Sequence, residues 1–120
     1  MVEYNMFKFE ELNVYQETLR FIDAVYELTS SFPREELFSL SNQLHRSVTS
    51  IALNIAEGTS RGRKEFCHFL DVARGSCYES VANLTIAKNR KYISEEKFRN
   101  VYQHCEIISK MLSKLKTSIQ

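Results

Sequence analysis

Residues 94–119 read SEEKFRNVYQHCEIISKMLSKLKTSI, and this stretch decides the fold class. Its apolar residues recur at alternating spacings of three and four, which is the period of one face of an α-helix. They are Phe98, Val101, Cys105, Ile108, Leu112, Leu115 and Ile119. Ser94, followed by two glutamates, is typical of a helix N-terminus, because its hydroxyl accepts a backbone N–H and acids favour the positive end of the helix dipole. The pattern therefore predicts a helix over about 94–119.

The same period occurs in three earlier segments, at about 9–30, 34–57 and 63–89. The apolar stripe of the first segment is Leu12, Tyr15, Leu19, Ile22 and Tyr26. The stripe of the second is Leu37, Leu40, Leu44, Val48, Ile51 and Ile55. The stripe of the third is Phe66, Leu70, Ala73, Cys77, Val81 and Leu84. Pro33 favours a helix that starts directly after it, and Gly58 predicts a left-handed cap at the end of the second helix.

Four helices of similar length joined by short links predict an all-α fold, an antiparallel up-down-up-down four-helix bundle that forms one domain over residues 1–120. Further apolar residues lie beside the four stripes: Phe21, Val25, Phe38, Phe69, Val72, Tyr78, Ile86 and Tyr102. They indicate a second buried surface, formed by oligomerisation or by a partner. The alternative is a wide core face in a monomer.

The composition bounds the class of protein. The net charge is +1, which argues against a strongly basic nucleic-acid binder but leaves a local basic surface open. No apolar run is long enough to span a membrane, and the N-terminal stretch Met1–Met6 lacks the basic start and apolar segment of a signal peptide. The cysteines are three in number, which fits reduced thiols, and we expect a cytoplasmic protein.

The charges are unevenly distributed along the chain. Residues 58–93 carry seven basic and three acidic side chains, whereas residues 1–31 carry two basic and six acidic ones. In an up-down bundle the second-to-third loop and the C-terminus share one end, and we expect six basic residues to gather there: Arg61, Arg63, Lys64, Lys110, Lys114 and Lys116. The functional interpretation is phosphate contact. The alternative is an ordinary solvated face with salt bridges between subunits.

Motifs for catalysis and metal binding are weak. Glu65 and His68 have the spacing of half a di-iron motif, but the second half is missing. By helical rise Cys77, Cys105 and His45 share one level of the bundle, yet cysteines on an apolar stripe usually behave as small hydrophobes. The sequence has no phosphate-binding glycine loop and no nucleophile motif. We therefore expect no enzyme activity, no cofactor and no metal.

A set of polar residues lies within or beside the apolar stripes: Gln43, Arg46, Asn54, Glu57, Arg74 and Glu79. One interpretation is hydrogen bonding that fixes helix register and assembly state. The other is direct contact with a ligand.

At these residues the sequence resembles the 23S ribosomal RNA intervening-sequence protein family, also called the four helix bundle protein family. The resemblance runs from Phe9 to about Leu115 and rests on an ordered set of short motifs. These are Phe32-Pro33, Gln43-Leu44 with Arg46, Ser50-Ile51, Asn54-Ile55-Ala56-Glu57-Gly58 with Arg61, Phe66, Phe69-Leu70, Ala73-Arg74-Gly75-Ser76 and Glu79.

The resemblance implies a four-helix bundle and a ring-like homopentamer. Some genes of the family lie within intervening sequences of large ribosomal RNA genes. The fold is also similar to the accessory variability protein of diversity-generating retroelements, which works beside a reverse transcriptase and binds nucleic acid. Gly75 lies inside a long predicted helix, where glycine costs about 1 kcal/mol relative to alanine. We therefore predict that Gly75 lies at a tight contact between helices or subunits.

Two functions follow as expectations. The first is a non-enzymatic homo-oligomeric module that binds RNA or DNA through the basic end. The alternative is a protein-interaction scaffold, or an accessory subunit of a separately encoded nucleic-acid enzyme such as a reverse transcriptase.

Overall fold

The computed structural model describes residues 6–120, and residues 1–5 of the N-terminal stretch lie outside the described part. Four α-helices make up the body: α1 (Asn13–Thr29), α2 (Leu40–Thr59), α3 (Arg63–Asn89) and α4 (Glu95–Ile119). Two short 3₁₀ turns, η1 (Lys8–Glu11) and η2 (Arg34–Glu36), precede α1 and α2. Within residues 6–120 no helix combines the length and the apolar character needed to cross a membrane.

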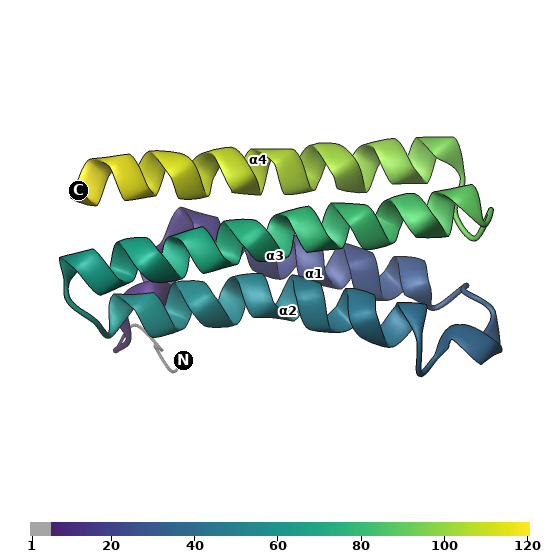
Figure 1. Ribbon diagram of the computed structural model, residues 1–120, viewed down its shortest axis with the longest axis horizontal. Helices are drawn as coiled ribbons and strands as arrows, with labels where there is room; N and C mark the ends of the chain where they lie inside the picture. Colours follow the sequence, from purple (N-terminus) through teal and green to yellow (C-terminus); the bar gives the residue numbers. More distant parts are fainter. Residues whose placement is uncertain (1–5) are drawn as a thin grey trace, which may run out of the picture.

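The four helices lie alongside one another (Figure 1). Helix α1 packs against α2 and α4, and α3 packs against the same two helices. The chain reverses between successive helices, so that the end of α2, the start of α3 and the end of α4 lie together on the left of Figure 1. The molecule measures 42 × 35 × 24 Å along its principal axes.

The apolar stripes predicted for the last three helices line the core. Fully buried members include Leu44 and Ile55 on α2, Leu84 on α3, and Ile108 and Leu112 on α4. Phe66, Val81, Phe98, Leu115 and Ile119 pack against this core from partly buried positions. The three-and-four spacing therefore placed these helices correctly, with the exception of Leu37.

The stripe predicted for α1 is correct only in part. Leu12, Tyr15 and Ile22 pack against the core from partly buried positions, but Leu19 and Tyr26 are exposed. The buried line of α1 is Val14, Thr18, Phe21, Val25 and Leu28. Phe21 and Val25 are therefore core residues and do not belong to a second surface. The polar Thr18 interrupts the apolar pattern in the sequence. In the fold its hydroxyl donates to the carbonyl of Val14 at 2.7 Å, which satisfies the buried oxygen.

Two predicted helix starts are also wrong. The first helix breaks at Leu12, whose backbone is extended, and η1 replaces its first turn. The second helix begins at Leu40 and not after Pro33, because Ser39 leaves the helical region with φ −128° and ψ −103°. Glu36 of η2 accepts a hydrogen bond from the Tyr92 hydroxyl at 2.7 Å, which ties this segment to the turn between α3 and α4.

Gly58 does not form a left-handed cap, because it has no positive φ and lies inside α2. Its importance is steric. A Cβ added to Gly58 would lie 2.7 Å from Cδ1 of Phe66 and 2.9 Å from Cβ of Phe69. The missing side chain therefore lets the end of α2 approach the start of α3 closely. The predicted N-cap of α4 is confirmed, since the Ser94 hydroxyl accepts the backbone N–H of Lys97 at 3.1 Å.

Candidate nucleic-acid interface

The basic residues around the α2–α3 turn lie at the end of the bundle where α4 also terminates (Figure 1). Arg63 and Lys64 are exposed in the first turn of α3, whose N-cap, Gly62, makes no side-chain hydrogen bond to that turn. Unpaired N–H groups at a helix start attract anions. Arg61 and Arg63 also line a pocket of about 310 Å³, together with Lys8 of η1. The sequence pattern did not identify Lys8 as a site residue, because it is 53 residues from Arg61 and only the fold brings the two together.

Arg61 is partly neutralised by its own neighbours. Its guanidinium lies 3.6 Å from Glu57 and 3.3 Å from Glu65, and its Cζ lies 5.4 Å from the centre of the Phe69 ring. Both ion pairs are exposed, so each contributes little to stability. They hold the guanidinium beside the pocket and reduce the positive potential that it offers to a phosphate.

The three lysines of α4 do not join one cluster with these arginines. Lys116 pairs with Asp71 of α3 at 2.9 Å, eight residues beyond the start of that helix. Lys110 lies further along, 4.0 Å from Glu106, and borders a groove with Arg74 and residues from the middle of α3. Among the ion pairs of residues 6–120, none involves Arg63, Lys64 or Lys114. Arg61 and Arg63 therefore share one pocket, whereas Lys116 is engaged by Asp71 and Lys110 borders the α3–α4 groove. That Lys64 and Lys114 join a phosphate-binding group stays a prediction.

The polar residues of α2 and α3 meet on one face. Two serine pairs join the helices, with Ser80 donating to Ser47 and Ser76 donating to Ser50, each at 2.9 Å. A pocket of about 310 Å³ beside these pairs is lined by Gln43, Arg46 and Glu79. Asn54 donates to the carbonyl of Ser50 at 2.8 Å, within its own helix.

Arg74 and Gly75 do not belong to this polar face between α2 and α3. Arg74 faces α4, where its Nε is buried without a hydrogen-bond partner among the residues that the structure describes. Gly75 is exposed, and a Cβ added there would meet nothing within 4 Å. The predicted tight contact of Gly75 with another helix of the same chain is therefore wrong, and Gly58 makes such a contact instead. A subunit contact at Gly75 stays a prediction.

The metal candidates do not come together. His45 lies between α1 and α2, where its Nε2 is 2.7 Å from the Thr29 hydroxyl and its ring stacks on Tyr26 at 3.9 Å. Burial lowers the pKa of His45. Cys77 and Cys105 face each other between α3 and α4, where the neighbouring Cys77 side chain and burial raise the pKa of Cys105. No group of three potential ligands forms within the described residues.

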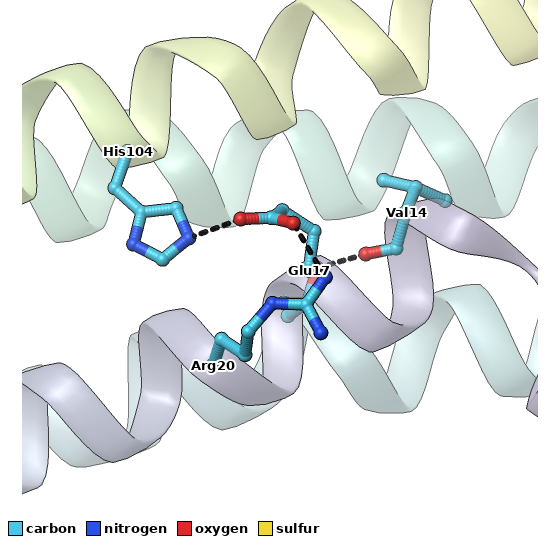
Figure 2. Close-up of polar contacts among 5 residues, drawn as sticks. Val14, Glu17, Arg20 and His104 are labelled. Carbon is cyan, nitrogen blue, oxygen red and sulfur yellow. Dashed lines mark hydrogen bonds and ion pairs between the residues drawn. The ribbon is translucent and has the colours of Figure 1, made fainter.

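A cross-helix polar link between α1 and α4 was not predicted from the sequence (Figure 2). Glu17 accepts from His104 Nε2 at 2.8 Å with one oxygen and from Arg20 at 2.7 Å with the other. These hydrogen bonds, that of Arg20 first, lower the pKa of Glu17. The His104 ring packs edge-on against the buried Phe21 at 5.3 Å. The Glu17–Arg20 spacing is visible in the sequence, but His104 is 87 residues away from Glu17.

Comparison with known proteins gives two findings. The model of the 23S rRNA-intervening sequence protein family matches residues 10–114. A similar solved structure is the crystal structure, at 1.70 Å resolution, of a protein with unknown function from the S23 ribosomal protein family, from Bacteroides thetaiotaomicron. The two chains are 26% identical with a TM-score of 0.80, and the match covers 87% of this chain and 95% of that chain. No curated protein matches the sequence.

Proposed function

This chain belongs to the 23S rRNA-intervening sequence protein family, and on that premise we propose that it is a non-enzymatic up-down-up-down bundle that assembles with copies of itself and binds RNA or DNA. The contact surface is the start of α3. The observation that carries this proposal is the uncompensated charge of Arg63 and Lys64 at an uncapped helix N-terminus, beside a pocket that Lys8 shares.

Three features of that end favour phosphate as the ligand. The side chains of Arg63 and Lys64 are exposed, so a polyanion reaches them without rearrangement of the bundle. The open N–H groups of the first turn add donors and a favourable dipole. Gly62 leaves open space, since a Cβ added there would meet nothing within 4 Å. Self-assembly repeats this modest surface around the oligomer, and repeated weak contacts raise the affinity for a long polymer.

Self-association is supported by apolar side chains that the bundle leaves exposed. Leu53 on α2 and Val72 on α3 are 67% and 39% exposed. The serine pairs fix the register of α2 and α3, and in that register Leu53 and Val72 stand level on the outward face. Gly75 lies one turn from Val72 on the same face. Gly75→Leu is therefore expected to reduce the oligomer mass measured by light scattering while the helical circular dichroism signal is kept. An unchanged mass would place the subunit interface elsewhere.

The test of nucleic-acid binding is fluorescence anisotropy of the purified protein with structured RNA and with duplex DNA, at about 50 and 200 mM salt. We expect binding that weakens steeply at the higher salt. Charge reversal of Arg63 and Lys64 to glutamate is expected to lower the slope of log affinity against log salt by about two for duplex DNA, because two phosphate contacts are lost.

The matched control is the charge reversal of both Lys97 and Arg99 to glutamate. These two exposed basic residues lie in the first turns of α4, at the opposite end of the bundle. This control changes the net charge equally and is expected to leave the slope nearly unchanged. Equal effects of the two double variants would show that only the total charge matters, which contradicts the proposed surface. Absence of binding at the lower salt would contradict nucleic-acid binding altogether.

A further inference from the structure

A groove runs between α3 and α4, on a different face from the start of α3. Its volume is about 490 Å³, within the range of roughly 300–1,000 Å³ that holds small ligands in proteins. The buried Cys77 and Cys105 form its floor, and Tyr78 and Tyr102 line it. These tyrosines are 66% and 43% exposed.

Two cations border the same groove. The Cζ of Arg74 lies 6.0 Å from the centre of the Tyr78 ring, and Lys110 reaches the rim from α4. The Nε of Arg74 is buried and lacks a hydrogen-bond partner among residues 6–120. A buried donor without an acceptor costs free energy, so an acceptor from a ligand would stabilise it. One acid, Glu106, also borders the groove and lies 4.0 Å from Lys110.

This combination fits one class of ligand. Exposed aromatic rings beside a guanidinium and an ammonium bind unpaired nucleobases by stacking and their phosphates by charge. In a duplex the base faces are stacked on neighbouring base pairs, so they cannot stack on the two tyrosines. Arg74 stands about 16 Å along α3 from Arg63, so one strand can occupy the groove and the basic end together.

We infer that the α3–α4 groove is a stacking site for unpaired bases of single-stranded nucleic acid, with Tyr78 and Tyr102 against the bases and Arg74 and Lys110 on the flanking phosphates. This inference rests on the proposed function and adds to it the strandedness of the ligand. It also assigns Arg74 a role in ligand contact, one of the two interpretations of that residue open from the sequence.

The experiment is anisotropy of the full chain with a fluorescent oligo(U) of about ten nucleotides, which suits the site sizes of single-strand binders. Tyr78→Ala and Tyr102→Ala are each expected to weaken binding about 5- to 150-fold, as loss of one stacked base does. Tyr78→Phe keeps the ring and is expected to bind like the parent. The control is Tyr26→Ala on α1, because Tyr26 is 45% exposed, almost the same as Tyr102, but lies outside the groove.

A second measurement needs no variant. Oligo(U) that carries 5-iodouracil is irradiated with the unmodified protein, and the cross-linked peptide is identified by mass spectrometry. We expect the cross-link on Tyr78 or Tyr102. A cross-link confined to other parts of the chain overturns the groove even if a tyrosine variant fails to fold.

The outcomes separate this inference from the proposed function. If both tyrosine variants bind like the parent while the charge reversal of Arg63 and Lys64 weakens binding, the stacking site is refuted and the phosphate contact at the start of α3 is supported. If the tyrosine variants weaken binding and the charge reversal does not, the phosphate contact at the start of α3 is refuted and the stacking site is supported. Absence of oligo(U) binding at low salt overturns the groove. If Tyr78→Ala or Tyr102→Ala lowers the oligomer mass, the groove is occupied by a second copy of the chain, which also overturns the inference.

Discussion

Gly58 gives the sharpest stability prediction, because its contacts allow a magnitude to be worked out. In Gly58→Ala the new Cβ would meet Cδ1 of Phe66 at 2.7 Å and Cβ of Phe69 at 2.9 Å. The Phe66 ring can rotate, but the Cβ of Phe69 is fixed to the backbone, so α2 and α3 must separate. Overpacking of this kind costs about 1–3 kcal/mol. Alanine recovers part of about 1 kcal/mol in helix propensity, and less near a helix end. We therefore expect a net loss of about 1–2 kcal/mol.

Gly75→Ala is the matched control, since the same substitution in α3 meets open space and is expected to stabilise the fold by about 0.5–1 kcal/mol. The assay is urea unfolding followed by circular dichroism, at one protein concentration, because self-association makes apparent stability depend on concentration. With a slope of about 1–3 kcal/mol per molar urea, the unfolding midpoint of the Gly58 variant should fall by roughly 0.3–2 M. A Gly58→Ala protein as stable as Gly75→Ala would refute the close-approach argument.

Three further predictions concern single side chains. Ser94→Ala removes the N-cap of α4 and is expected to cost about 1 kcal/mol in urea unfolding, whereas Ser94→Asp should keep most of the stability. Burial lowers the pKa of His45 from 6.5, so the unfolded chain binds more protons below that pH, and stability should fall as the pH drops through and below 6.5. A His45→Gln variant should lose this part of the pH dependence, and an unchanged pH profile would contradict it. Under native conditions iodoacetamide should modify the half-buried Cys67 well before the buried Cys77 and Cys105, and equal rates measured by mass spectrometry would contradict the observed burial.

The helices were predictable wherever the apolar period is continuous, as it is from Leu40 to Ile55 and from Phe98 to Ile119. On α1 the period located only part of the buried face, because it treats a polar residue as exposed, and Thr18 is buried with its hydroxyl bonded to its own helix. The predicted start of α2 was wrong for a related reason. Pro33 marks a permitted helix start, but Glu36 bonds to Tyr92 of a distant turn, and no local pattern contains that partner.

The candidate site was only partly predictable, because the period of one helix does not fix its register against another. Lys116 pairs with Asp71, so Lys110, six residues earlier on the antiparallel α4, stands level with the middle of α3. The sequence predicted that Lys110 lies near Arg61 only because the α2–α3 loop and the C-terminus share one end of an up-down bundle. The residues of the α2–α3 turn are close in sequence, and Arg61 and Arg63 accordingly do line one pocket.

The two serine pairs between α2 and α3 also bear on how the chain acquires its structure. Each joins residues only 26 or 33 positions apart, across a turn of three residues, so the loop that must close is short and its entropic cost is small. The contact of α1 with α4, held by Glu17 and His104 at a separation of 87, requires most of the chain to be in place. We therefore expect the α2–α3 hairpin to form first in folding and α1 to dock last, with the amide protons of α1 exchanging before those of α2 and α3.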